Sequence, residues 1–311
     1  MQVAAWKVWL ALATVYLVWG STYLAIRVMV ETMPPLLSGG LRFIVAGALL
    51  FAFLLLRGGR ARLRVKRVEL GASAIVGMAL VLGGNGLVTV GEQDVPSGLA
   101  ALIVASVPLW VVLWRKVAGE GNSGRGLLGA GVGFAGVAML VLPEQDQSGA
   151  GLAGALLIAL AAFLWATGSF FSGRLPVPGD PLVATSYEML CGGALMMVSG
   201  LLAGEASDVR LQAFAASSIA ALVYLTLAGS IAAFTSYVWL LRHAPIARVA
   251  TYAYVNPVIA VLLGWAMLSE PLTTPVVAGA VTIIASVAFS IRHDKDSEAS
   301  CRAEELDLSR G

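Results

Sequence analysis

The stretch from Val8 to Ile26, VWLALATVYLVWGSTYLAI, runs for 19 residues without a charged side chain. A helix needs about 20 apolar residues to cross the hydrocarbon core of a bilayer. The stretch is longer than the apolar part of a secretory signal peptide, and no cleavage site flanked by small residues follows it. It therefore predicts a first transmembrane helix that is kept in the protein.

The remainder of the chain continues this pattern. Of its 311 residues, 59% are hydrophobic and 12% are charged, whereas soluble domains contain about 25% charged residues. The apolar stretches are about twice as long as a membrane-spanning strand and lack its alternation. We therefore predict an all-α, polytopic membrane protein with ten transmembrane helices. The predicted spans are Val8–Met29, Pro35–Leu56, Leu70–Val90, Ser97–Trp114, Gly126–Leu142, Gly149–Phe171, Leu182–Leu202, Ala215–Leu241, Val249–Leu268 and Pro275–Ile291.

The distribution of lysine and arginine predicts the orientation, because cytoplasmic loops are enriched in both. With the N-terminus inside, 17 of the 20 basic residues fall in inner segments, and only Arg210 falls in an outer loop. We therefore expect both termini to be cytoplasmic and the protein to lie in the plasma (inner) membrane. The polar segment 293–311 has the mixed charge of a disordered cytoplasmic tail.

The two halves of the chain resemble each other. A shift of 146 positions places Trp19 on Trp165 and Gly47 on Gly193, and a shift of 149 places Pro108 on Pro257. The sequence therefore predicts two repeats of five helices, residues 1–143 and 144–292. An odd number of helices per repeat inverts the second copy relative to the first, as in many secondary transporters.

Polar and aromatic side chains in the predicted spans are candidates for a solute site, because polar groups in hydrocarbon should face the bundle interior or a wet cavity. Aromatic walls with a few hydroxyl and amide groups suit a small amphipathic solute. For any one aromatic residue, core packing or an interfacial position is the alternative. The candidate solute-binding residues are Tyr16, Trp19, Tyr23, Asn85, Trp165, Ser169, Ser230, Tyr237, Tyr254 and Asn256.

Two prolines and two charges occupy equivalent positions in the repeats. Pro108 and Pro257 interrupt helices near mid-span, as hinges of an alternating-access path or as static kinks. Arg42 and Glu188 are each a buried charge in the second helix of their repeat. Glu188 is the only acidic residue well inside a predicted span, so it is the candidate proton carrier. Structural pairing or snorkelling is the alternative for both charges.

Several motifs are absent. No G-x-x-x-x-G-K-[ST] phosphate loop occurs, so we expect no nucleotide. The two cysteines and two histidines give no metal-ligand spacing, and the connecting loops leave no room for a catalytic domain. We therefore expect no metal, no cofactor, no nucleic-acid partner and no enzyme activity. The expected partners are the lipid bilayer and a small-molecule solute, with proton coupling as an option.

The order of motifs resembles the EamA family of the drug/metabolite transporter superfamily from about Trp9 to Ile291. Gly84-Asn85-Gly86 and Val95-Pro96-Ser97-Gly98 are similar to those of the YedA-type inner-membrane exporters. The other motifs that carry the resemblance are Val18-Trp19-Gly20-Ser21-Thr22-Tyr23, Leu41-Arg42-Phe43, Ser106-Val107-Pro108-Leu109, Tyr252-Ala253-Tyr254-Val255-Asn256-Pro257-Val258 and Ser269-Glu270-Pro271-Leu272.

This resemblance implies a ten-helix basket around a central cavity lined mainly by helices 1, 3, 4, 6, 8 and 9, and efflux of metabolites, amino acids or drugs. By this resemblance, the residues to watch are Trp19, Asn85, Pro108, Tyr254, Asn256 and Pro257. The first helix lacks the carboxylate of the four-helix small multidrug branch, which puts that branch's proton exchange in doubt. We expect an exporter of small organic metabolites. Uptake or facilitated diffusion, and a non-transporting membrane scaffold, are the alternatives.

Overall fold

The computed structural model describes residues 5–119, 124–141, 150–244, 249 and 251–289. Within them all regular structure is helical. The expected tail 293–311 and the expected repeat boundary between residues 143 and 144 lie outside the described residues. The polytopic all-α prediction is confirmed, because seven helices are long and apolar enough to cross a membrane.

The first half of the chain forms five helical rods, and the third and fourth of them each consist of more than one helix. The third rod joins α3 to α4 through a π-helical segment, and the fourth is broken between α5 and α6. The elements are α1 (Ala5–Val30), α2 (Pro35–Arg62), α3 (Arg67–Gly77), the π-helical segment Met78–Gly86, α4 (Leu87–Gly91), α5 (Ser97–Val104), α6 (Val107–Val117) and α7 (Gly124–Val141).

The second half repeats this order. Its third rod again contains a π-helical segment, between α10 and α11. The elements are α8 (Ala150–Ser172), α9 (Pro181–Leu202), two 3₁₀ turns at Glu205–Asp208 and Leu211–Ala213, α10 (Ala216–Tyr224), the π-helical segment Leu225–Ala232, α11 (Ala233–His243), α13 (Tyr252–Leu268) and a last helix over Thr274–Phe289.

Three of the ten expected spans are shorter apolar helices, at Gly126–Leu140, Tyr252–Leu268 and Thr274–Phe289. The ninth was expected to start at Val249, but α13 begins only at Tyr252. Conversely, α2 continues past the expected end at Leu56 to Arg62, with a kink at Gly59, whose φ of 68° favours glycine. The count of ten membrane crossings therefore remains a prediction.

The second helices of the two halves, α2 and α9, pack closely against each other at glycine residues. A Cβ on Gly40 would lie 2.8 Å from the Met197 nitrogen, and one on Gly193 would lie 2.9 Å from the Ile44 nitrogen. Ser186 donates to the Gly47 carbonyl at 3.3 Å in the same interface. Because small residues let helices approach closely in a membrane, these positions fix α2 against α9. Gly40 is equivalent to Ser186, and Gly47 is equivalent to Gly193, because each pair is separated by 146 positions. The two helices therefore use equivalent residues in their contact.

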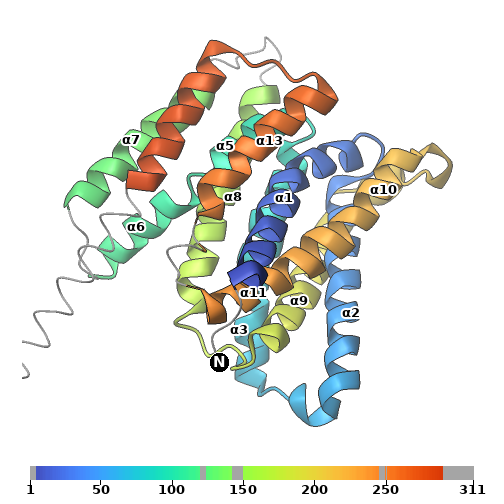
Figure 1. Ribbon diagram of the computed structural model, residues 1–311. Helices are drawn as coiled ribbons and strands as arrows, with labels where there is room; N and C mark the ends of the chain where they lie inside the picture. Colours follow the sequence, from blue (N-terminus) through green and yellow to red (C-terminus); the bar gives the residue numbers. More distant parts are fainter. Residues whose placement is uncertain (1–4, 120–123, 142–149, 245–248, 250, 290–311) are drawn as a thin grey trace, which may run out of the picture.

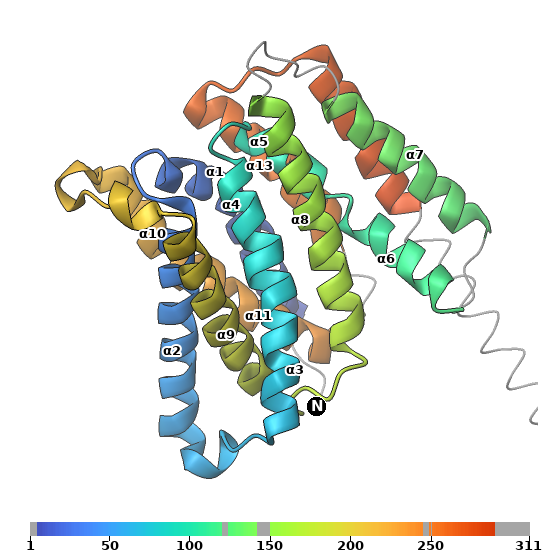
Figure 2. The ribbon, with the colours of Figure 1, turned by 180° about the vertical axis from the view of Figure 1, so that it is seen from behind.

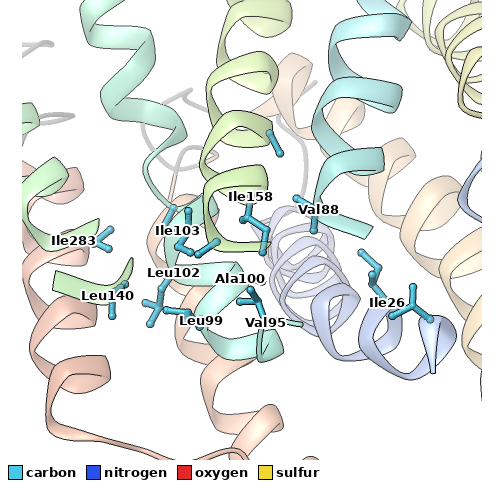
Figure 3. Packing of buried hydrophobic residues seen from close by; sticks show 14 of the residues in the cluster. Ile26, Val88, Val95, Leu99, Ala100, Leu102, Ile103, Leu140, Ile158 and Ile283 are labelled. Atoms are coloured by element: carbon cyan, nitrogen blue, oxygen red, sulfur yellow. The ribbon is translucent and has the colours of Figure 1, made fainter. Parts of the chain in front are cut away.

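The main apolar core lies between α1, α4, α5, α8 and α7. Figure 3 shows Val88 of α4, Ile158 of α8 and Ala100 of α5 in this core. At one edge of the molecule α7, which comes after α6, and the last helix, which comes after α13, lie side by side (Figures 1 and 2). The other helices form the main bundle, with α2 at the edge away from α7.

Candidate functional site

A cavity of about 180 Å³ lies at the centre of the bundle. Its wall contains most of the residues that the sequence predicts for a solute site. Those that line it are Trp19, Tyr23, Arg42, Asn85, Pro108, Trp165, Glu188, Ser230, Asn256 and Pro257. The cavity therefore gathers side chains from α1, α2, α8, α9, α13, α6 and both π-helical segments.

Residues at equivalent positions of the two halves contribute to the cavity wall. Trp19 and Trp165 both line it, as do Arg42 and Glu188, and each pair is separated by 146 positions. Gly84 and Ser230, also 146 positions apart, lie in the two π-helical segments. The cavity is thus placed where the two halves meet.

The π-helical segments shape the cavity through backbone geometry. Such segments are rare and often occur at functional sites. A Cβ on Gly84 would lie 2.6 Å from Cε3 of Trp165, so only glycine leaves room for this indole. Asn85 uses its side-chain amide to donate to the Leu80 carbonyl at 3.2 Å, within the same segment. The wall opposite α8 is therefore set by a glycine and an amide.

An aromatic cluster forms part of the cavity wall. Trp19 packs against Phe234, Tyr237 and Tyr252, with ring centroids 6.3, 5.2 and 5.4 Å away. Its indole Nε1 donates to the Gly229 carbonyl at 3.2 Å. Next to this cluster the Tyr16 hydroxyl forms a hydrogen bond with the Thr251 hydroxyl. The cluster ties α1 to α11 and α13.

The two charged residues in the wall do not pair with each other. Arg42 Nε donates to Ser230 Oγ at 2.9 Å, and its guanidinium lies 4.6 Å from the centre of the Phe43 ring. Glu188, on α9, is half-buried and also lines the cavity. Among the described residues, the ion pair within 4.0 Å joins Arg62 to Asp180, outside the cavity. The cavity therefore offers a solute one guanidinium and one carboxyl group.

The two prolines lie at breaks in helices beside the cavity. Pro108 lies in the first turn of α6, after the chain leaves α5 at Val104, and Pro257 lies inside α13. A proline cannot donate a hydrogen bond to the carbonyl four residues earlier. These carbonyls belong to Val104 and Ala253, and both residues line the cavity. Asn256 adds a buried Oδ1 that has no hydrogen-bond partner among the described residues.

Comparison with known proteins identifies the family. The profile of the EamA-like transporter family matches the chain twice, over residues 6–142 and 152–292. The chain belongs to the EamA-like transporter family. It is 42% identical to the Escherichia coli inner membrane transporter YedA over 269 residues, which cover 85% of this chain and 83% of YedA.

More distantly similar proteins match along most of their length. The Bacillus subtilis transporter YoaV is 25% identical over 90% of this chain and 95% of its own. A crystal structure that is 22% identical has a TM-score of 0.64 and covers 95% of this chain and 100% of its own. That structure supports the fold alone. The resemblance to the EamA family predicted from the motifs is therefore confirmed.

Four predicted site residues of this EamA protein do not line the cavity. Tyr16 and Tyr237 lie in the layer behind Trp19. Tyr254 is half-buried against the main core, since the cavity-facing positions of α13 are Ala253, Asn256 and Pro257. Ser169 is exposed on α8. The residue types mark side chains suited to a solute site, but the packing of neighbouring helices decides which of them reach the cavity.

One buried acid of the EamA chain was missed. Glu92 directly follows α4, and its side chain is 0% exposed. Glu188 is thus not the only acidic residue that merits attention as a proton carrier, although Glu92 lies just outside the predicted span that ends at Val90. Burial, and then the negative charge of Glu270, raise the pKa of Glu92 well above its ordinary value, against the opposing effect of Arg27 and Arg42. The stretch Glu92-Gln93-Asp94 is typical of a solvated turn, so nothing in the sequence marks Glu92 as buried.

Proposed function

We propose that this EamA-family protein is a secondary transporter that exports small organic solutes across the inner membrane by alternating access. The observation that carries the proposal is the cavity between the two halves, lined by equivalent residues of each. A site placed between inverted repeats can be exposed to either side when the halves exchange conformations. The relatives carry names of transporters, which supports the same conclusion.

The proposed topology has ten crossings in two inverted repeats, residues 1–143 and 144–292, with both termini cytoplasmic. The distribution of lysine and arginine supports it. The described contacts are consistent with it. Arg62 and Asp180 pair at 2.6 Å, and both fall in expected inner loops. Glu205 bonds the start of α2, and Glu270 bonds the start of α5, where outer loops are expected.

The cavity chemistry suggests the kind of solute. Trp19 and Trp165 offer aromatic walls for an apolar body, while Arg42 and Glu188 offer opposite charges. Desolvated charges bind strongly only when each finds a partner. We infer a solute with an apolar body and at least one charged group, and a zwitterion would use both charges. Pro108 and Pro257 would let the helices beside this site bend between the two states.

Transport by purified protein in proteoliposomes tests the proposal. The panel contains amino acids, sugars and cationic dyes, with and without a pH gradient, and sidedness is read from everted and right-side-out vesicles. We expect efflux of at least one charged solute. Arg42→Gln should weaken efflux of anionic or zwitterionic solutes, and Glu188→Gln should weaken efflux of cationic or zwitterionic ones.

Trp265→Phe is a matched control, because Trp265 is 54% exposed on α13 and does not line the cavity. Net uptake without efflux would favour the uptake alternative. A protein that moves no solute but purifies with one fixed partner would favour the scaffold. Undiminished pH-driven efflux in Glu188→Gln would reject Glu188 as the proton carrier.

A further inference from the structure

Glu92 is a fully buried acid that does not line the solute cavity. Its backbone nitrogen completes the last turn of α4 by donating to the Val88 carbonyl at 2.9 Å. Its side chain points inward, where neither carboxylate oxygen has a hydrogen-bond partner among the described residues. Val88 and Val95, which flank it in sequence, both belong to the apolar core (Figure 3). A carboxyl in such a place is much more stable neutral than ionised.

The nearest basic side chain does not neutralise the Glu92 carboxyl by contact. Arg27 Nη1 donates to the backbone carbonyls of Glu92 and Gln93, so this guanidinium is bound to the end of α4. Arg42 of α2 also interacts electrostatically with Glu92, but its Nε is hydrogen-bonded to Ser230. Attraction from both arginines therefore reaches the carboxyl without a hydrogen bond to either oxygen.

A second carboxyl faces the same site. Glu270, in the segment after α13, accepts hydrogen bonds from the Ser97 and Gly98 nitrogens at 2.7 and 2.9 Å, and it repels a negative charge on Glu92. The buried Ser97 Oγ also has no hydrogen-bond partner among the described residues. Tyr23 of α1 also interacts electrostatically with Glu92, and Asp94 of the same turn is exposed. Two acids and one unpaired hydroxyl thus share this site.

We propose that the Glu92 carboxyl is a proton-binding site at the outer end of the transport path, neutral while that end is closed and ionised when it opens to water. The outer location rests on the proposed function and its topology. On opening, the O–H bond of the carboxylic acid breaks, its proton passes to water, and the carboxylate keeps the electron pair. Closing requires the reverse step. Tyr23 and Arg42 line the solute cavity and interact electrostatically with Glu92, so its charge is felt by the solute site.

Infrared spectroscopy of the full chain in lipid tests whether the Glu92 carboxyl is neutral. At neutral pH we expect a carboxylic acid C=O band in the wild type that is lost in Glu92→Gln. Asp94→Asn is the matched control, since Asp94 lies in the same turn but is exposed, and it should retain the band. An identical carboxylic acid spectrum in wild type and Glu92→Gln would overturn the proposal.

Thiol labelling tests whether ionisation accompanies opening. Val95→Cys, in a background without Cys191 and Cys301, places a thiol at a position that is 0% exposed beside Glu92. Its labelling rate is divided by that of Leu211→Cys, an exposed site on the expected outer side, to cancel the pH dependence of thiol reactivity. We expect the ratio to rise with pH in the wild type and to stay flat in Glu92→Gln. The same rise in both, or none in the wild type, would contradict the proposal.

Glu270→Gln gives a second test that leaves Glu92 intact. Removing the neighbouring negative charge should move the midpoint of the labelling curve to lower pH, and an unmoved or higher midpoint would count against the site. None of these readouts requires a transported solute. If no solute is moved while the band and the labelling behave as expected, the transport proposal fails and the proton site stands. If solute is moved while Glu92→Gln behaves as the wild type, only the proton site fails.

Discussion

Gly84 leaves room for the indole of Trp165 because it has no side chain. The indole of Trp165 occupies the space that a Cβ would take, and the rest of that indole forms a wall of the cavity. On the other side, Trp19 is fixed by its hydrogen bond to the Gly229 carbonyl and by three aromatic neighbours. Two equivalent tryptophans are thus positioned by backbone groups of the two π-helical segments. A solute in contact with these indoles would meet surfaces with little freedom to move.

Gly84→Ala should impair transport without unfolding the chain. The new methyl would lie 2.6 Å from Cε3 of Trp165 and must displace the ring into or along the cavity. Such overpacking typically costs about 1–3 kcal/mol. We expect a reduction of transport of about tenfold or more, a factor that corresponds to about 1.4 kcal/mol in the barrier. Initial efflux rates in proteoliposomes measure it.

Gly71→Ala is the control for this substitution, because Gly71 lies in the same rod and a Cβ there meets no atom within 4 Å. It should transport as the wild type and melt at a similar or slightly higher temperature, since alanine favours helix. Equal transport by both variants would mean that the Trp165 wall does not contribute to the solute path.

At the scale of elements, loops of one half hold the helix ends of the other. Glu205 accepts hydrogen bonds from the Leu36 and Leu37 nitrogens at 3.1 and 2.8 Å, at the start of α2. Glu270 does the same for Ser97 and Gly98 at the start of α5. Carboxylates are well suited to helix N-termini, where unpaired N–H groups and the helix dipole favour negative charge. These two acids therefore join the halves at one end of the bundle.

Glu205→Gln and Glu270→Gln should each loosen one helix start. A glutamine offers one acceptor oxygen in place of two and no charge, so we expect a loss of about 1.5–3 kcal/mol in local stability. Hydrogen exchange followed by mass spectrometry should show faster exchange near Leu36 in the first variant and near Ser97 in the second. Each variant serves as the control for the other. If either variant exchanged faster to the same extent near Leu36 and near Ser97, the carboxylates would not act locally.

Asp180 caps α9 at the opposite end. It accepts hydrogen bonds from the Leu182 nitrogen at 3.0 Å and from Arg62 Nη2 at 2.6 Å. Partial burial acts to raise the pKa of Asp180, but the hydrogen bonds from Arg62 and Leu182 outweigh it and hold the pKa below its ordinary value. A depressed pKa means that the contribution to stability is present above the ordinary carboxyl range and is lost as the pH falls through the folded-state pKa.

Asp180→Asn should therefore destabilise the protein by about 1 kcal/mol or less at neutral pH, because the pair is largely exposed. The difference in melting temperature between wild type and variant should shrink as the pH falls below about 4. Differential scanning fluorimetry in detergent measures both. A difference that grows on acidification would mean that folding raises the pKa of Asp180 instead of lowering it.

At the scale of the whole molecule, the sequence predicts the helices better than it predicts their interruptions. Hydropathy marks α1 and α9 closely, because burial in lipid selects continuous apolar runs. The π-helical segments at Met78–Gly86 and Leu225–Ala232 leave no such signal, since they depend on how neighbouring helices pack. The cavity faces of Trp19 and Asn256 follow from helical periodicity. Periodicity does not predict that Tyr16 lies outside the cavity or that Glu92 is buried, because both depend on tertiary contacts.

The inverted topology has a sharp experimental signature in two loops that occupy equivalent places. The first begins in the last turns of α2, at Gly59 with a φ of 68°, and the second begins just after α9, at Gly204 with a φ of 86°. Inversion places them on opposite sides of the membrane, with Arg60 inside and Ser207 outside. In cells, a membrane-impermeant maleimide should label Ser207→Cys at once and Arg60→Cys only after permeabilisation, both in a background without Cys191 and Cys301. The two sites are equally suited to labelling, since both are exposed. Labelling of both thiols from the same side would rule out inverted halves, and a cavity between the halves could then not alternate by exchanging their conformations.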